Sequence, residues 1–307
     1  MTERTLFMRT PRLIGLALAG TAALVLGACA DSATLEGKAS SKAIVVGSQD
    51  YYSNEIIAEV YAQALEDAGY EVDRQFRIGQ REVYMPELQA GSIDLMPEYT
   101  GNLLQYLDPA AKATGADEVI AALPSALPDG LRALEAAPAS DQDSYVVTRA
   151  FADEHSLTSI GDLAGIEGLI LGGNSELETR PSGPTGLKGV YGVTVSFAPI
   201  EDSGSALTLK ALRDGSVHLV DVYSADPALA SGDLTVLEDP EGMFLSSRVV
   251  PLVSDAVDEG AAAVINRVSA ALDPDDLIGM NRRSTEEAAS AAAIATAWLN
   301  SEGLLGK

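Results

Sequence analysis

Five residues in this sequence have the types that could hold a small charged solute: Tyr99, Asp143, Tyr145, Arg180 and Tyr223. The faces of tyrosine rings attract a quaternary ammonium, an ion that has no N–H to donate. The guanidinium of Arg180, in a loop rich in Gly and Pro, can grip a carboxylate with two hydrogen bonds. A second interpretation stays open, because tyrosines are common at half-buried core positions and loop arginines are commonly solvated.

An internal repeat gives two of these tyrosines equivalent positions. Residues 88–100 and 212–224 share Leu, Gly-Ser, a β-branched residue, Leu, Tyr and then Thr or Ser, at an offset of 124 without a gap. Each copy predicts a helix end, a glycine, a buried strand and then the tyrosine. Ligands of open α/β sheets bind at the carboxyl ends of strands. Two such lobes facing each other would bring Tyr99 and Tyr223 into one cleft, whereas chance similarity would imply no cleft.

The order of predicted elements indicates an α/β fold with largely parallel sheets. Apolar periodicity, glycines and prolines predict the following elements, given in chain order: strands at 43–47, 71–78, 93–96, 144–148, 169–171 and 193–197, and helices at 53–68, 82–90, 150–155 and 160–163. Ser53 is the expected N-cap of the first helix. The C-terminal part is helical. Asp273 before Pro274 predicts a helix start, and Ser284 with Glu287 has capping-box spacing before an Ala-rich helix.

The composition excludes several classes of function. Lys and Arg number 20 against 45 Asp and Glu, a formal charge of −25, which argues against nucleic-acid binding. The single cysteine, Cys29, excludes an internal disulfide and a multi-cysteine metal site. The motifs of serine hydrolases, zinc proteases and P-loop enzymes are missing from the sequence, and His155 and His218 fit structural roles. We therefore expect no enzyme, no metal and no cofactor.

The N-terminus has the pattern of a bacterial targeting signal. Three arginines precede an uncharged, mostly apolar run at 13–26, which is too short for a membrane span of about 20 residues. Leu-Gly-Ala follows and then Cys29, which is similar to a lipobox, where cleavage leaves a lipidated cysteine. A plain secretory signal with an incidental cysteine is the alternative. The prediction is a signal peptide at 1–28, a tether at 29–43 and an extracytoplasmic, lipid-anchored protein.

Short motifs along nearly the whole mature chain resemble the substrate-binding proteins of osmoprotectant ABC importers, which take up glycine betaine, choline, carnitine and related compounds. The motifs that carry the resemblance lie at 47–50, 61–65, 81–83, 91–95, 97–101, 171–173, 180–183 and 221–224. The most specific is Pro-Glu-Tyr-Thr-Gly at 97–101. The resemblance implies a two-lobed periplasmic-binding-protein fold of type II, with the ligand cleft between lobes. The implied lobes are 44–142 plus 249–307 and 143–248.

The resemblance also implies ligand-binding roles for individual residues. Tyr99, Tyr145 and Tyr223 match cage tyrosines around a cationic head, Asp143 lies beside the cage, and Arg180 matches the arginine that grips a carboxylate. Three residues depart from the pattern: Gln49 replaces a common lysine, Asn102 a common threonine, and Ser247 the usual fourth aromatic. With Ser247 the cage is either open on that side or closed by Tyr51, Tyr52 or Phe244.

The function implied is a lipoprotein that captures a quaternary-ammonium or zwitterionic osmolyte and delivers it to an ABC permease subunit. Two alternatives remain at this point: a tethered surface module that senses a similar solute, and a lipoprotein enzyme acting on one. The sequence offers no set of nucleophile, base and oxyanion donors for the enzyme.

The lipid anchor can be tested directly. Cys29→Ala should release the protein from the membrane fraction, because the lipid on Cys29 is the only predicted attachment. Fractionation of cells that express the variant, followed by immunoblotting, measures this. A variant that stays in the membrane fraction contradicts the lipobox.

Overall fold

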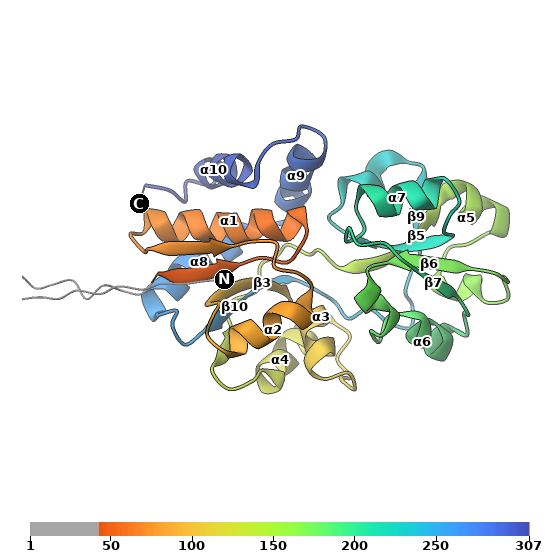
Figure 1. Ribbon diagram of the computed structural model, residues 1–307, viewed down its shortest axis with the longest axis horizontal. Coiled ribbons are helices and arrows are strands. Elements are labelled where there is room, and N and C mark those ends of the chain that lie inside the picture. The colour runs from red at the N-terminus through yellow and green to blue at the C-terminus, as the bar shows by residue number, and fades with distance from the viewer. Residues whose placement is uncertain (1–42, 307) are drawn as a thin grey trace, which may run out of the picture. The chain divides into compact units, whose positions relative to one another are not determined.

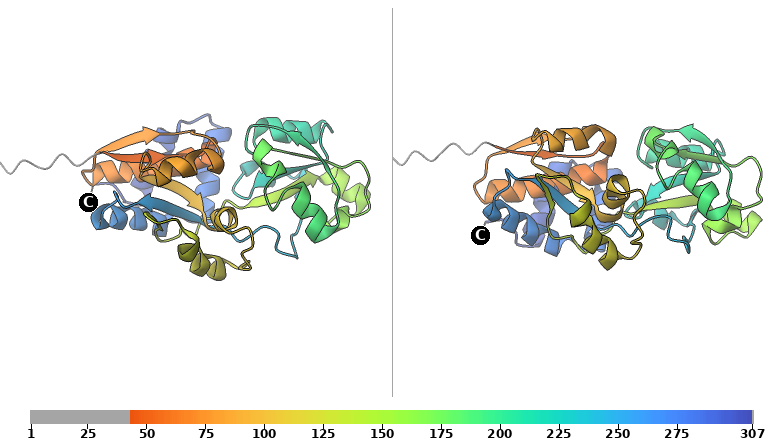
Figure 2. Two further views of the ribbon diagram at one scale, coloured as in Figure 1. Left: turned by 60° about the horizontal axis from the view of Figure 1, so that its bottom comes forward. Right: turned by 90° about the horizontal axis from the view of Figure 1, so that it is seen from below.

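The computed structural model describes residues 43–306, which form two five-stranded sheets with helices on both faces of each (Figure 1, Figure 2). The first sheet has the order β2-β1-β3-β10-β4 and contains β1 (Ile44–Gly47), β2 (Val72–Gln75), β3 (Leu95–Tyr99), β4 (Leu131–Ala133) and β10 (Val249–Ser254). The second has the order β7-β6-β8-β5-β9 and contains β5 (Asp143–Thr148), β6 (Ile170–Gly173), β7 (Ser196–Pro199), β8 (Leu219–Tyr223) and β9 (Leu234–Val236). The expected two-lobed α/β fold is confirmed.

Both sheets are mixed, although mainly parallel sheets were expected. In each sheet two strand pairings are parallel and two are antiparallel. The antiparallel pairings all involve β10 in the first sheet and β5 in the second. These are the two strands that the chain enters directly from the other sheet's elements, so neither is preceded by a βα crossover that would impose a parallel direction.

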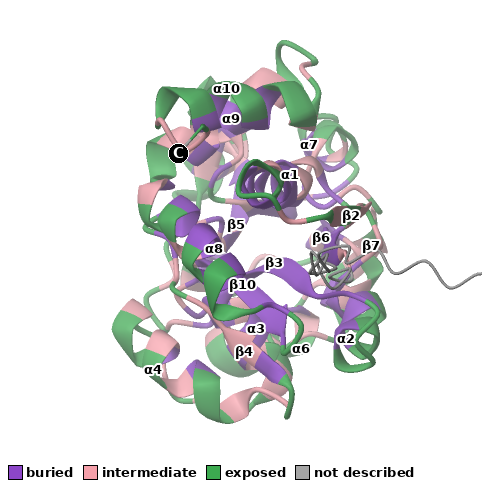
Figure 3. Cartoon of the chain, turned by 90° about the vertical axis from the view of Figure 1, so that its left-hand side faces the viewer, coloured by how far each residue is buried: buried purple, intermediate pink, exposed green. Residues whose placement is uncertain are grey.

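Apolar helix faces cover both sides of each sheet. On the first sheet one face packs against α1 (Tyr52–Asp67), α8 (Glu259–Ala271), α9 (Pro274–Thr285) and α10 (Ala291–Ser301), and the other against α2 (Arg81–Gln89), α3 (Thr100–Leu107) and α4 (Ala116–Ala126). On the second sheet one face packs against α5 (Arg149–His155), η1 (Ile160–Leu163), η2 (Ser175–Glu178) and η3 (Leu187–Tyr191), which α6 (Pro184–Gly186) precedes. The other face packs against α7 (Ala206–Arg213) and η4 (Pro227–Ser231). Figure 3 shows β3 and β10 buried, whereas α4, α8 and α10 have exposed outer faces.

The sequence repeat corresponds to equivalent structural elements. Strands β3 and β8 have bounds offset by 124 residues, and each follows a glycine with positive φ, Gly91 at 69° and Gly215 at 78°. Because an L-residue rarely adopts such a φ, glycine at this point lets the helix stop and the chain turn into the strand. The repeat therefore sets the two tyrosines at the same ends of two corresponding strands.

Two expected helix caps are wrong and one is confirmed. Asp273 accepts a hydrogen bond from the Asp276 amide and caps α9, with proline at the first position. Ser53 lies inside α1, which starts at Tyr52, and its hydroxyl donates to Asp141 instead. Ser284 lies inside α9, and Ser290 caps α10. Local spacing does not reveal that α9 continues past the expected cap, since its packing against α1 and α10 sets its length.

The strand positions are consistent with two crossings between lobes. The first sheet takes its strands from 44–133 and 249–254, and the second from 143–236. The lobe limits inferred from the sequence, at 142/143 and 248/249, remain a prediction. The predicted signal peptide and nearly all of the predicted tether lie outside the described residues, as does Cys29.

A buried ion pair holds α2 against β3. Arg81 and Glu98 are 3% and 0% exposed and form two hydrogen bonds of 2.8 Å. Tyr84 also donates to Glu98 at 2.6 Å, and the Tyr99 amide donates to it at 3.0 Å. The carboxylate thus accepts four hydrogen bonds and fixes the backbone just before Tyr99. A fully bonded pair of this kind tolerates burial, whereas one partner alone does not.

Removing Glu98 should therefore destabilise the fold strongly. Glu98→Ala leaves the Arg81 guanidinium buried without a counter-charge, so the free energy of unfolding should fall by about 3–5 kcal/mol. Urea denaturation followed by circular dichroism measures this. The control is Glu87→Ala, an exposed residue of α2, which should change stability by about 0.5 kcal/mol or less. Equal effects of the two substitutions would contradict the role of the buried pair.

Candidate ligand-binding site

Tyr99 and Tyr223, the last residues of β3 and β8, lie on either side of one further tyrosine. Tyr51 donates to the Tyr99 hydroxyl at 2.5 Å, and Asn54 donates to the same oxygen at 3.1 Å. The ring of Tyr51 lies 4.9 Å from the ring of Tyr223, tilted by 48°. The structure thus brings together an aromatic group of Tyr51, Tyr99 and Tyr223, drawn from both lobes. Burial raises the pKa of all three phenols, so their hydroxyls stay protonated and donate or accept hydrogen bonds.

Tyr145 belongs to a different cluster from that aromatic group. Its ring is fully buried in the core of the second lobe and meets Phe244 edge-on at 5.1 Å. Its hydroxyl donates to the carbonyl of Ser182, in the loop that follows Arg180. The structure therefore does not place Tyr145 against Tyr51 or Tyr99. Its direct contact with a ligand remains a prediction, whereas its bond to Ser182 gives it a part in shaping the loop.

Two carboxyl groups lie next to the aromatic group on neighbouring strands. Asp143 pairs with Tyr223 in the register of β5 and β8, and Asp221 pairs with Tyr145. Asn102 of α3 donates to Asp143 across the lobe boundary. The Oδ1 atom of Asp221 is buried and has no hydrogen-bond partner among the described residues. Burial and the neighbouring Asp143 raise the pKa of Asp221 well above its ordinary value.

Arg180 also reaches across the lobe boundary. Its guanidinium forms an ion pair of 3.1 Å with Glu82 and a weaker contact of 3.4 Å with Gln80. Gln80 in turn donates to Ser203 of the second lobe at 3.1 Å. These contacts hold the amino end of α2 against the second lobe. Arg180, Asp143 and the start of α2 line the same cavity.

That cavity has a volume of about 190 Å³ and is lined by residues of both lobes. Its polar lining includes Arg81, Asn102, Asp143, Arg180 and Ser182. Pockets for drug-sized ligands span roughly 300–1,000 Å³. The smaller volume fits a small solute, and both charge signs are present on its walls.

Gln49 and Ser247, the other two predicted site residues, are both buried. The backbone amide of Gln49 donates to Asn54, and its Nε2 atom has no partner among the described residues. Ser247 is 0% exposed, and its hydroxyl accepts from the amides of Gly101 and Asn102 at 3.0 and 3.1 Å and donates to Asn102 Oδ1 at 2.6 Å. Ser247 therefore satisfies two free N–H groups at the start of α3. The open or closed cage at this position stays a prediction.

Tyr51 and Asp221 are the two residues that sequence reasoning missed as parts of the site. Tyr51 was considered only as one of three side chains that could close a fourth wall. Its position two residues after Gln49, before α1, was the available signal. Asp221 stands two residues before Tyr223 in the repeat, so β-strand alternation already placed both side chains on the same face of β8.

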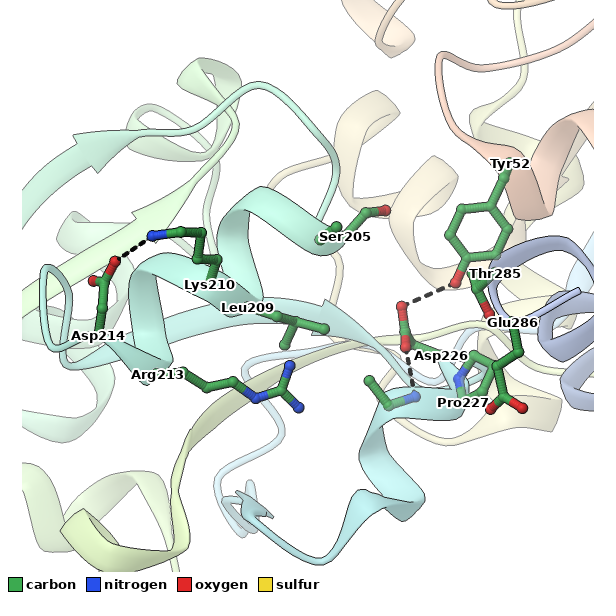
Figure 4. A pocket seen from close by; sticks show the side chains of 12 residues that line it. Tyr52, Ser205, Leu209, Lys210, Arg213, Asp214, Asp226, Pro227, Thr285 and Glu286 are labelled. Carbon is green, nitrogen blue, oxygen red and sulfur yellow. Dashed lines mark hydrogen bonds and ion pairs between the residues drawn. The ribbon is translucent and has the colours of Figure 1, made fainter. Parts of the chain in front are cut away.

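A larger cavity lies elsewhere between the lobes (Figure 4). It has a volume of about 650 Å³ and lies between α7, η4 and the end of α9. Its two cations already have partners, since Lys210 pairs with Asp214 at 2.9 Å and Arg213 with Asp233 at 2.8 Å. Tyr52 donates to Asp226 on its wall at 2.9 Å. The larger cavity is lined by none of Asn102, Asp143 and Arg180, the predicted site residues that line the smaller one. The smaller cavity is therefore the better candidate.

Comparison with known proteins places the chain in a family. Residues 42–301 match the family described as the substrate-binding domain of the ABC-type glycine betaine transport system. The chain belongs to this family. Its members are substrate-binding proteins of ABC transporters and not enzymes, and they work outside the cytoplasm with the other transporter components. No helix within residues 43–306 is long and apolar enough to cross a membrane.

Three relatives show the extent of the similarity. The glycine betaine-binding protein YehZ of Escherichia coli K12 is 26% identical over 277 residues, which cover 85% of this chain and 90% of that protein. A solved structure titled as a glycine betaine/carnitine/choline ABC transporter superposes with a TM-score of 0.67 at 18% identity, covering 85% and 99% of the two chains. The structure of lactococcal OpuAC, closed on glycine betaine, superposes with a TM-score of 0.61 at 14% identity, covering 85% of this chain and 96% of that chain. These two superpositions establish the fold.

The capping role of Ser247 leads to a stability prediction. Ser247→Ala should lower the free energy of unfolding by about 0.5–2 kcal/mol, because two amides at the start of α3 lose their acceptor. Ser246→Ala is the matched control, since Ser246 is half-buried and only its backbone carbonyl, not its hydroxyl, takes part in a side-chain hydrogen bond among residues 43–306. Chemical denaturation of both variants measures the difference. If Ser247→Ala unfolds at the wild-type denaturant concentration, the capping role is refuted.

Proposed function

We propose that this protein is an extracytoplasmic lipoprotein that captures a quaternary-ammonium or zwitterionic solute, such as glycine betaine or choline, and delivers it to an ABC permease. The lobes separate to admit the solute and close on it. The solute then occupies the boundary where the aromatic group, the two carboxyl groups and Arg180 meet.

The observation that carries this proposal is the aromatic group made of Tyr51, Tyr99 and Tyr223. Two of its rings come from the first lobe and one from the second, so its members part when the lobes separate. A trimethylammonium group between such rings gains about 1–2 kcal/mol from each desolvated cation–π contact. The methyl groups also bury apolar surface against the rings, which a hydrated inorganic cation does not.

Charge on the cavity wall supports the same class of solute. Asp143 lies on the cavity wall and pairs in register with Tyr223, and Arg180 supplies positive charge on the same wall. A zwitterion whose opposite charges lie a few bonds apart can satisfy both. Choline carries a hydroxyl in place of the carboxylate and so leaves Arg180 with Glu82 alone.

The names of the relatives agree with this solute class. YehZ is named as a glycine betaine-binding protein, and the lactococcal structure holds glycine betaine. The role of the family in transport supports delivery to a permease. Anchoring through Cys29 rests on the lipobox-like sequence.

Binding and uptake together test the proposal. Calorimetric titration of the purified protein with glycine betaine, choline, carnitine, proline betaine and ectoine should reveal binding of at least one quaternary ammonium. Uptake of the labelled ligand by cells that lack the gene, with and without complementation, then separates transport from a tethered sensing module. Binding without restored uptake favours the sensing module, and binding of none of the five contradicts the proposed solute class.

The role of Arg180 gives a quantitative prediction. Arg180→Ala should lower the affinity for glycine betaine about 10- to 150-fold. This is the equivalent of about 1.5–3 kcal/mol for one charge-assisted hydrogen-bonded pair. The affinity for choline should fall much less, because choline has no carboxylate. Loss of the ion pair with Glu82 affects both ligands equally, so the ratio of the two affinities isolates the contact with the carboxylate.

Arg213→Ala provides the matched control for this comparison. Arg213 lies on the larger cavity and pairs with Asp233, so its removal should leave both affinities unchanged. Equal losses for betaine and choline in Arg180→Ala place Arg180 outside the contact with the carboxylate. If only Arg213→Ala loses affinity for the ligands, the ligand site is the larger cavity.

A further inference from the structure

The two carboxyl groups of the site form an unusual pair. Asp143 and Asp221 lie on adjacent antiparallel strands and are 8% exposed each. The register of β5 and β8 sets the two side chains diagonally on the same face of the sheet. The second oxygen of Asp221, Oδ1, is buried without any partner among the described residues. The pair therefore includes a buried acceptor that no described residue satisfies.

The charged and titratable groups around the pair do not neutralise two carboxylates. Those facing it from neighbouring elements are Arg81 of α2, Arg180 of the loop after η2, Tyr145 of β5, Tyr223 of β8 and Asp141 of the crossing segment. Arg81 makes both of its short bonds to Glu98, and Arg180 is paired with Glu82. The tyrosines are neutral, and Asp141 adds to the negative potential. Two buried carboxylates without a free counter-charge do not both ionise.

We propose that Asp143 and Asp221 together hold one proton in the free protein and release it to solvent when the cationic head of the ligand binds beside them. The step balances as the loss of one proton from the carboxyl pair to water or buffer, leaving two carboxylates around one bound cation. It rests on the proposed function, since it requires a ligand with a cationic head.

The sign of the resulting pH dependence follows from linkage. Burial raises the pKa of Asp221, so the free pair binds a proton that the complex does not. Binding then competes with protonation, and affinity rises with pH. If one proton is released, the dissociation constant falls by about tenfold for each unit rise in pH over the range in which the free pair is protonated. A ligand held by the tyrosine rings alone has no such dependence, since phenols with raised pKa values do not titrate there.

Calorimetry in two buffers measures the released proton. The wild-type protein is titrated with choline chloride and with glycine betaine at pH 6 and 7, in phosphate and in a buffer with a large enthalpy of ionisation. The expected difference in heat corresponds to about one proton released for each ligand bound. A heat that does not depend on the buffer overturns the proposal.

Asp221→Asn separates the pair from other titrating groups. The amide has nearly the same shape and no titratable proton, so proton release should disappear and the affinity for choline should become independent of pH. Asp226→Asn is the matched control. Asp226 is a half-buried carboxyl whose pKa is also raised by desolvation, but it accepts a hydrogen bond from Tyr52 on the larger cavity. Proton release that persists in Asp221→Asn, or that disappears in Asp226→Asn, overturns the assignment.

A measurement without ligand keeps the two proposals distinguishable. Infrared difference spectra of the free protein should contain the band of a protonated carboxyl at pH 7 that is lost in both Asp143→Asn and Asp221→Asn, with both variants folded by circular dichroism. Absence of the band overturns the shared proton whatever the ligand is. The band without binding of betaine or choline overturns the ligand half of the proposal together with the proposed function.

Discussion

The lobes of this protein meet through polar side chains that neither lobe satisfies by itself. Three contacts cross the boundary: Arg180 forms an ion pair with Glu82, Gln80 donates a hydrogen bond to Ser203, and Asn102 donates one to Asp143. Buried polar groups without partners are costly, so a structure with charges at its strand ends must pair them with the opposite lobe, with water or with a ligand. A zwitterionic solute offers both charge signs at once. In the proposed function, closure on such a solute buries these groups together with it.

Asp141 ties the two lobes together beside this boundary. Its buried carboxyl accepts from Ser53 of α1 at 2.8 Å and from the amide of Ala225, which follows β8, at 3.0 Å. Asn281 of α9 donates at 3.1 Å to both Ser53 Oγ and the Ala225 carbonyl. Burial raises the pKa of Asp141 to about 7. This network fixes the crossing segment, so the contacts at the cavity are the ones that can open when the lobes rotate.

The sequence predicted the fold and the strand-end tyrosines because those features are local. Glycine stops, strand alternation and the repeat place Tyr99 and Tyr223 without any long-range information. The role of Ser247 was not predictable, because the amides that it caps lie 146 and 145 residues away in the chain. Tyr51 was not identified as the link between the two tyrosines for the same reason, since ring packing depends on how the lobes meet. Asp221 was within the recognised motif, and only its burial beside Asp143 marks it as part of the site.

We propose that a quaternary-ammonium solute binds where the tyrosines of the two lobes meet, and a crystal structure of the protein with glycine betaine is the decisive measurement. We expect the trimethylammonium group to lie against the rings of Tyr99 and Tyr223, beside Asp143 and Asp221, with the carboxylate at Arg180. Glycine betaine bound in the larger cavity beside Leu209 and Arg213, with Tyr51 and Tyr223 still in ring contact, would contradict it.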